Sequence, residues 1–188
     1  DQSFLIQQLV NEGRLDASLL NGKRETYVIT LVKRPFGQKG QALVIAGSDK
    51  RGTVYGIYEL SKQIGVSPWY FWADVPVKQA ASLYVKKGLY TDGEPAVRYR
   101  GIFLNDEAPC LTNWVKATFG NYNHAFYETV FELLLRLKGN FLWPAMWNNA
   151  FYDDDPLNGP LADEMGIIMS TSHHEPCARA QKEWHRYG

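Results

Sequence analysis

The sequence predicts an α/β protein, with a small α/β N-terminal domain over residues 1–92 and the first units, about three, of a (β/α)8 barrel over residues 93–188. Three observations support this prediction. Two β-branched runs precede a helical period in the first half, strand-like runs alternate with helical ones in the second, and a Gly- and Pro-containing link at residues 86–95 separates the halves. Because a complete barrel needs about 250 residues, the prediction makes this chain a fragment of a longer one.

The first half contains two strand-like runs between two helical ones. In chain order we expect a helix over 4–10, strands over 27–32 and 43–46, and a helix over 53–64 capped by Ser48 or Thr53. The glycines between the second strand and this helix fit neither common phosphate-binding spacing, which favours a structural turn. Residues 69–72 are four consecutive aromatics, for which we favour packing between domains over sugar stacking.

The second half repeats a strand-then-helix rhythm. We expect strands over 99–104, 140–143 and 167–170, and helices over 125–138, over 161–165 and from about Pro176 onward. The strongest of these helices should bury Leu133, Leu134 and Leu137 on one face and end at a C-cap glycine, Gly139. Strands that alternate with helices indicate a parallel sheet, which fits either an opening barrel or a doubly wound sheet.

The charge balance argues against two broad classes of partner. Lys and Arg number 20 and so do Asp and Glu, which makes the formal net charge zero. General nucleic-acid and membrane-surface binders usually carry a basic excess, and no apolar run reaches the roughly 18 residues of a membrane span. Aromatic residues make up 14%, a high share that points toward a planar ligand such as a carbohydrate, with core packing as the alternative.

Polar clusters follow all three expected strands of the second half. They lie at residues 105–107, 143–149 and 173–175. In α/β folds the functional face lies at the carboxyl ends of parallel strands. One polar strand end is commonplace, but three in succession predict a single site at this edge of the sheet.

Asp106 and Glu107 are the candidate catalytic residues of the first cluster. Carboxylates at a sugar site accept hydrogen bonds from hydroxyls, or act as acid or base in glycoside cleavage. Adjacent residues of an extended chain point to opposite sides, so at most one of the two should face a pocket. The alternative is that Asp106 caps the next segment and Glu107 is solvated.

The other two clusters contain residues suited to contact a sugar. Trp143 and Trp147 offer flat apolar faces for a pyranose ring, and Asn148 both donates and accepts hydrogen bonds. Tryptophans in such a loop are equally ordinary core residues. His173 and His174 lack metal-ligand spacing, which favours hydrogen bonding to a polar ligand, or burial in the core.

We therefore expect neither a metal nor a cofactor. Residues 153–155 are three consecutive aspartates, which we expect to form a solvated acidic loop, with calcium binding as a minor alternative. Cys110 and Cys177 lie near the polar clusters, but nothing in the sequence provides a partner that would stabilise a thiolate.

Several long motifs resemble those of glycoside hydrolase family 115. Residues 51–60 (RGTVYGIYEL), 65–69 (GVSPW) and 72–76 (WADVP) are similar to that family's N-terminal domain, and residues 99–109, 133–151 and 171–182 resemble the opening of its catalytic barrel. The motifs occur in the right order, and together they cover most of residues 41–184.

The resemblance implies an enzyme of the α-glucuronidase type, since the family consists of xylan α-1,2-glucuronidases. Such an enzyme releases glucuronic acid, or its 4-O-methyl form, from xylan side chains with inversion of configuration. Its partner is xylan or a xylo-oligosaccharide with glucuronic acid decoration, its expected location is secreted or periplasmic, and a homodimer of the full-length protein stays open. The implied substrate contacts are Asn105, Trp143, Trp147, Asn148, His173, His174 and Glu175.

The resemblance also implies that further catalytic carboxylates belong to later strands, beyond Gly188. Inversion needs a general acid and a general base about 6.5–9.5 Å apart, so we expect these residues to supply only part of that pair. Two alternatives stay open. One is a non-catalytic carbohydrate-binding chain that uses Trp143 and Trp147, and the other is a hexosaminidase-like glycosidase whose leaving sugar is an N-acetylhexosamine.

Overall fold

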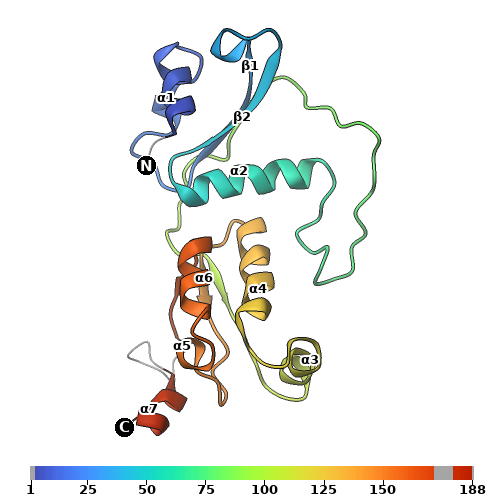
Figure 1. Ribbon diagram of the computed structural model, residues 1–188, viewed down its shortest axis with the longest axis vertical. Coiled ribbons are helices and arrows are strands. Elements are labelled where there is room, and N and C mark those ends of the chain that lie inside the picture. Colours follow the sequence, from blue (N-terminus) through green and yellow to red (C-terminus); the bar gives the residue numbers. More distant parts are fainter. Residues whose placement is uncertain (1–2, 172–179, 188) are drawn as a thin grey trace. The chain divides into compact units, whose positions relative to one another are not determined.

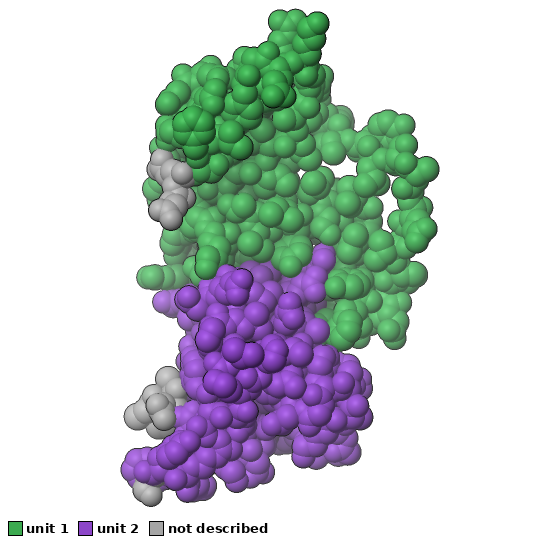
Figure 2. All heavy atoms as spheres, in the orientation of Figure 1, with its two compact units in different colours: residues 1–98 green, residues 99–188 purple. Residues whose placement is uncertain are grey.

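Two three-stranded sheets organise the part of the chain that the structure, a computed structural model, describes: residues 3–171 and 180–187. One sheet has the order β2-β1-β3 and the other the order β4-β5-β6. Each lies in its own compact unit, residues 1–98 and residues 99–188, which Figure 2 colours separately. The mixture of sheets and helices confirms the predicted α/β class.

The first sheet is antiparallel and lies between two helices (Figure 1). Strand β1 (Tyr27–Lys33) pairs with β2 (Gln41–Gly47) along its whole length, which confirms both predicted strands. Successive residues of a strand face opposite sides. Val28 and Val32 therefore meet Leu9 of α1 (Phe4–Asn11) in one buried cluster, while Tyr27 faces α2 (Lys50–Gln63).

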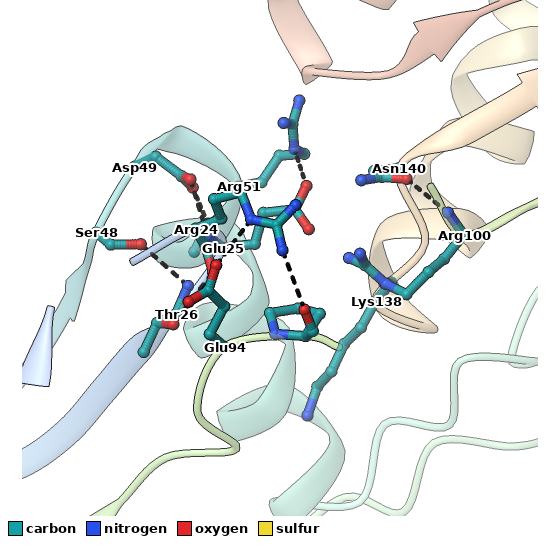
Figure 3. Close-up of polar contacts among 12 residues, drawn as sticks. Arg24, Glu25, Thr26, Ser48, Asp49, Arg51, Glu94, Arg100, Lys138 and Asn140 are labelled. Carbon is teal, nitrogen blue, oxygen red and sulfur yellow. Dashed lines mark hydrogen bonds and ion pairs between the residues drawn. The ribbon is translucent and has the colours of Figure 1, made fainter. Parts of the chain in front are cut away.

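The turn from β2 into α2 is a structural one, and its cap differs from the prediction. Asp49, rather than Ser48 or Thr53, caps α2, with its Oδ1 accepting from the Gly52 backbone N–H at 2.7 Å. Its Oδ2 accepts from the backbone N–H of Glu25 at 2.8 Å. The buried Glu25 carboxylate in turn pairs with Arg51 at 2.5 Å (Figure 3). Asp49 thus joins the start of α2 to the approach to β1.

Gly52 is required here because the helix touches the sheet's backbone. A Cβ at this position would lie 2.3 Å from the Thr26 carbonyl oxygen, well inside any real contact. The glycine of this turn therefore serves close packing of a helix on a strand, which is the structural role that the sequence favoured.

The segment between α2 and residue 98 returns to the first sheet. The aromatic run at residues 69–72 forms turns, with Trp69 and Phe71 exposed and the Phe71 ring edge-on to Trp72 at 5.4 Å. Its role in packing between domains stays a prediction. Further on, β3 (Leu89–Tyr90), inside the predicted link, pairs with β1, and Arg24 binds Glu94 at 2.7 Å. The two compact units divide after residue 98, whereas the sequence suggested a boundary after residue 92.

The second sheet is parallel, as the alternation of strands and helices predicted. Its strands are β4 (Gly101–Phe103), β5 (Phe141–Trp143) and β6 (Ile168–Met169), in chain order across the sheet. Phe103 pairs with Trp143 and Leu142 with Met169, so the three strands end at the same edge. Parallel strands in chain order agree with the predicted first strands of a barrel, and the complete barrel stays a prediction.

Five described helices accompany this sheet. They are α3 (Cys110–Phe119), α4 (His124–Arg136), α5 (Phe151–Asp154), α6 (Asn158–Met165) and α7 (Gln181–Tyr187). The prediction included α4 and the end of α6 at Gly166, but missed α3 and α5. Pro176, the predicted start of the last helix, lies outside the described residues.

Helix α4 contributes seven buried residues, more than any other described element of the second unit. Phe126, Tyr127, Val130 and Phe131 are almost fully buried, whereas Leu137, predicted to share that face, is 46% exposed. Leu137 is exposed because α4 has already ended at Arg136.

The end of α4 also corrects the predicted cap. The left-handed residue is Lys138 (φ 60°), whose N–H bonds to the Leu135 carbonyl, while the Gly139 N–H bonds to the Leu134 carbonyl at 2.7 Å. This is the Schellman arrangement with lysine in the usual glycine position. Gly139 is also closely packed, since a Cβ there would lie 3.1 Å from the Arg100 carbonyl oxygen, which is tighter than most real contacts.

Asp155 joins the starts of α4 and α6. Its Oδ2 accepts from the His124 backbone N–H at 2.9 Å and lies 2.7 Å from His124 Nδ1, and its Oδ1 accepts from the Leu157 N–H at 2.9 Å. These bonds, above all that from the His124 backbone, hold the pKa of the Asp155 carboxyl below its ordinary value.

This lowered pKa predicts a pH-dependent stability. Because the folded-state pKa lies below the unfolded value of about 3.9, the contribution of the Asp155 charge is present above that value and is lost as the pH falls through the folded-state pKa. We expect Asp155→Asn to lower the free energy of unfolding at neutral pH by about 0.5–1 kcal/mol. The gap from wild type should close as the pH falls below about 4.

Urea denaturation over this pH range measures the effect. Glu128→Gln, on the exposed surface of α4, is the matched control and should follow wild type at every pH. A gap between Asp155→Asn and wild type that stays constant into acid would contradict a role for the charge.

Candidate functional site

The carboxyl ends of β4, β5 and β6 bring two of the three predicted polar clusters together. Residues 104–109 follow β4 and residues 144–150 follow β5, and the two segments bond to each other. The third predicted cluster, His173, His174 and Glu175, lies outside the described residues. The candidate site is therefore built from the first two segments, with the end of β6 and the start of α7.

Asp106 is the buried centre of this edge. Its side chain is 1% exposed, and its carboxylate accepts from the Met146 N–H at 3.1 Å, from the Trp147 N–H at 3.0 Å and from Asn149 Nδ2 at 2.7 Å. A buried charge is tolerated when hydrogen bonds satisfy it. Asp106 thus fastens the segment after β5 to the end of β4, across 40 residues of sequence.

Asn105 and Glu107 point the other way. In the segment after β4, burial alternates from residue to residue, so that Leu104 and Asp106 are buried while Asn105 and Glu107 are exposed. The Glu107 N–H approaches Asn105 Oδ1 at 3.4 Å, which makes a tight local turn. This separation is what the sequence predicted for two adjacent carboxylates, and it leaves Glu107 exposed to solvent.

The segment after β5 presents two residues to solvent. Residues 144–146 and 150 are buried, whereas Trp147 and Asn148 are exposed, with Trp147 at 47%. Asn148 adopts a left-handed conformation (φ 60°), which asparagine tolerates better than most residues. We call Trp147 and Asn148 the loop tip.

Trp143 has a different environment from Trp147. It lies on β5 itself, its ring meets Phe103 of β4 at a centroid distance of 6.0 Å, and its side chain is only partly exposed. Its indole N–H is buried and finds no hydrogen-bond partner among the residues that the structure describes. Trp143 therefore belongs to a face of the sheet, and the structure does not place it in the exposed loop tip.

A small pocket lies beside the loop. Its lining comes from the ends of β5 and β6 and from α5 and α7, and consists of Pro144, Ala145, Phe151, Tyr152, Met169, Ser170, Thr171, Ala180 and Glu183. Glu183 contributes a carboxylate that is only 3% exposed. Burial, and next the Glu183 charge, raise the pKa of Tyr152 above its ordinary value.

Sequence reasoning missed Glu183. The residue lies three positions after Ala180, and both line the pocket, which is the spacing of one helical face. The three-residue spacing of Ala180 and Glu183 was visible in the sequence. A helix expected to start near Pro176 did not, however, indicate which of its faces would be buried.

The three aspartates of residues 153–155 are engaged rather than freely solvated. Arg186 of α7 bonds to both Asp153 and Asp154, Tyr187 bonds to Asp153 at 2.7 Å, and Asp154 accepts from the Ala150 N–H at 2.7 Å. These contacts, first that with Asp154, raise the pKa of Arg186. Within residues 3–171 and 180–187, no group of three His, Cys, Asp or Glu side chains is arranged to hold a metal ion.

Arg100 lies away from this site. Arg100 precedes β4 at the opposite, amino end of the strand, where its Nε donates to the Lys138 carbonyl at 2.9 Å (Figure 3). It therefore contributes nothing to the carboxyl edge.

Among the described helices, none has the length and apolar character that crossing a membrane requires.

Known proteins share this arrangement. The family model for glycosyl hydrolase family 115 matches residues 92–188, which include the whole candidate site. Among solved structures, a family GH115 4-O-methyl-α-glucuronidase with specificity for decorated arabinogalactans is 35% identical over 88% of this chain, with a TM-score of 0.77. The chain spans 22% of the length of that protein. A search of curated proteins gave no match.

The contacts of Asp106 predict a loss of stability when its charge is removed. Asp106→Asn keeps the shape but replaces one acceptor oxygen with an NH2 group that faces N–H donors. We expect the free energy of unfolding to fall by about 2 kcal/mol, as for hydrogen bonds to a charged group. Urea denaturation followed by circular dichroism measures it.

Glu107→Gln is the matched control, because it removes an exposed charge from the next residue. It should change the free energy of unfolding by less than about 0.5 kcal/mol. Equal effects of the two substitutions would show that the bonds to Asp106 do not hold this edge together.

Proposed function

Because the chain belongs to glycoside hydrolase family 115, we propose that it forms the first part of the catalytic region of an α-glucuronidase. The enzyme would release glucuronic acid, or its 4-O-methyl form, from a decorated polysaccharide. The observation that carries this proposal is the loop tip of Trp147 and Asn148, held at the carboxyl edge of a parallel sheet beside a pocket.

The loop tip supplies the two kinds of contact that a pyranose needs. An exposed indole offers a flat apolar face to the C–H groups of the ring, and an amide both donates to and accepts from hydroxyls. Asn105 and Glu107, exposed at the neighbouring strand end, extend the same edge. His173, His174 and Glu175 keep their predicted part as sugar contacts, and Trp143 would contribute from the sheet face.

The carboxylates divide into different roles in this proposal. Asp106 already accepts three hydrogen bonds from the loop, which suits a role in orienting the loop that would contact the sugar. Glu107 is exposed and suits a catalytic acid or base. Glu183 lines the pocket, where we assign it to sugar hydroxyls, because like charges repel and the carboxylate of a glucuronate would be disfavoured beside it.

An inverting mechanism requires a second carboxylate about 6.5–9.5 Å from the first, with a water between. We propose that this partner comes from a later strand of the barrel. Xylan is the proposed polymer from the family resemblance, and a decorated arabinogalactan is the second candidate, because the solved relative is named for that specificity. A polymeric substrate favours a secreted or periplasmic location, and a homodimer stays a prediction without a contact to support it.

Product analysis tests the activity. The natural protein that contains this chain is incubated with a 4-O-methylglucuronic acid-decorated xylo-oligosaccharide, a decorated arabinogalactan and an N-acetylhexosaminide, and early products are followed by proton NMR. We expect uronic acid, with the β-anomer first because the α-linkage is inverted. An α-anomer first would contradict inversion, N-acetylhexosamine would favour the hexosaminidase alternative, and saturable binding without product would favour a non-catalytic role.

Substitution of the loop tip tests where the sugar binds. Trp147→Ala removes the stacking face, and we expect the dissociation constant for the xylo-oligosaccharide to rise about tenfold, which corresponds to about 1.4 kcal/mol. Isothermal titration calorimetry measures it. Trp69→Ala is the matched control, since Trp69 is 45% exposed in the other unit, and equal losses in the two variants would contradict a specific platform.

A further inference from the structure

Side chains from other elements, rather than a strand ladder, hold the backbone of the segment after β5. The Ala145 N–H donates to the Tyr127 hydroxyl oxygen at 3.3 Å, the Met146 and Trp147 N–H groups donate to Asp106, and the Ala150 N–H donates to Asp154. Four amides thus depend on three side chains. Removal of one of these acceptors leaves a buried or half-buried N–H unsatisfied, which is costly and favours a different loop conformation.

Aromatic packing surrounds Tyr127, one of these acceptors. It lies in the first half of α4 and is fully buried. Its ring contacts Phe126 at 5.2 Å, stacks near Phe131 at 5.9 Å and meets Phe151 edge-on at 4.7 Å. Aromatic packing on several sides fixes the ring, so the position of the hydroxyl follows from the position of α4.

The hydroxyl also keeps its proton. Burial raises the pKa of Tyr127 well above its ordinary value, and the nearby Asp106 charge adds to this. The group therefore stays neutral at any physiological pH, and its oxygen accepts the Ala145 N–H under all conditions in which the enzyme works.

We propose that Tyr127 is a positioning residue for sugar recognition. Together with Asp106 it holds Ala145, Met146 and Trp147 in the conformation that turns the Trp147 indole toward solvent. Tyr127 touches no substrate, and it acts through the backbone of the loop. The inference rests on the proposed function in one respect only, namely that the presented indole binds a sugar.

The conformation of the loop tip depends on this positioning. Trp147 and Asn148 are exposed next to the buried residues 144–146, and Asn148 has a left-handed backbone. A left-handed asparagine is sparsely populated without supporting contacts. If the Ala145 N–H loses its acceptor, the segment before the loop tip becomes more flexible. Trp147 and Asn148 then adopt several conformations, and ordering them on binding costs entropy.

Tyr127→Phe isolates the hydroxyl, because phenylalanine keeps the ring contacts and removes one oxygen. The protein is labelled with 5-fluorotryptophan, and the fluorine signal of Trp147 is assigned through Trp147→Phe. In Tyr127→Phe we expect the Trp147 signal to shift or broaden without added sugar, while the signals of the other five tryptophans of this chain stay in place. The dissociation constant for the decorated xylo-oligosaccharide should rise about fivefold to tenfold.

Tyr122→Phe is the control with matched burial. Tyr122 is 1% exposed and its ring also packs on Phe126, but its hydroxyl lies 3.0 Å from the Thr112 hydroxyl in α3. We expect this variant to lose similar stability in urea while the Trp147 signal and the sugar affinity stay at wild-type values. This comparison separates positioning of the loop from general loss of a buried hydroxyl.

The outcomes of this experiment are distinguishable. An unmoved Trp147 signal in Tyr127→Phe, or an equal movement in Tyr122→Phe, overturns the positioning role. A Trp147 signal that moves in Tyr127→Phe while wild-type protein shows no response to the sugar supports the positioning role and overturns the proposed ligand instead.

Discussion

The buried carboxylate of Asp106 is the contact on which the carboxyl edge of the second sheet depends. A charge that is 1% exposed needs partners that satisfy it, and Asp106 finds three in the segment after β5. Strands β4 and β5 are only three residues long, so their ladder alone does little to fix the loops at their carboxyl ends. The hydrogen bonds of the Asp106 carboxylate therefore extend the order of the sheet into the loop whose residues we propose to contact the substrate.

Other side chains near Asp106 also accept hydrogen bonds from backbone amides of the loops. Loop amides that have no strand partner are satisfied by Tyr127 of α4 and Asp154 of α5, and Asp154 is in turn held by Arg186 of α7. Asp155 similarly joins the starts of α4 and α6. Acidic side chains thus serve as connectors between elements, which frees Trp147, Asn148 and Glu107 to face solvent. A rigid frame with an exposed polar and aromatic tip suits the binding of a stiff, hydroxyl-rich ring.

The parts of the fold that were predictable from the sequence are those set by local patterns. Strands β1 and β2, the three parallel strands of the second sheet and the long helix α4 follow from periodicity and β-branched runs, whereas β3 lies in a segment expected to be a link. The alternation that buries Asp106 and exposes Glu107 follows from extended geometry alone. The family was also correctly identified, because its motifs are long and occur in order.

The rest was not predictable because it depends on contacts between distant residues. Ser48, Asp49 and Thr53 are all residue types that cap helices, and Asp49 is further fixed by a bond from the Glu25 N–H to its second oxygen, 24 residues away. The aspartates at residues 153–155 resemble a solvated run until α7 brings Arg186 against them. Likewise, Gly139 resembles a helix cap, whereas the left-handed residue is Lys138 and Gly139 packs closely against the Arg100 carbonyl.

Amide hydrogen exchange at Met146 and Trp147, followed by NMR, tests the central claim most directly. If the Asp106 carboxylate holds this segment, both amides should be protected in the wild-type protein and should lose that protection in Asp106→Asn, while amides of the α4 core such as Phe131 stay protected. Rapid exchange of both amides in wild type, or unchanged protection in Asp106→Asn, would contradict the account.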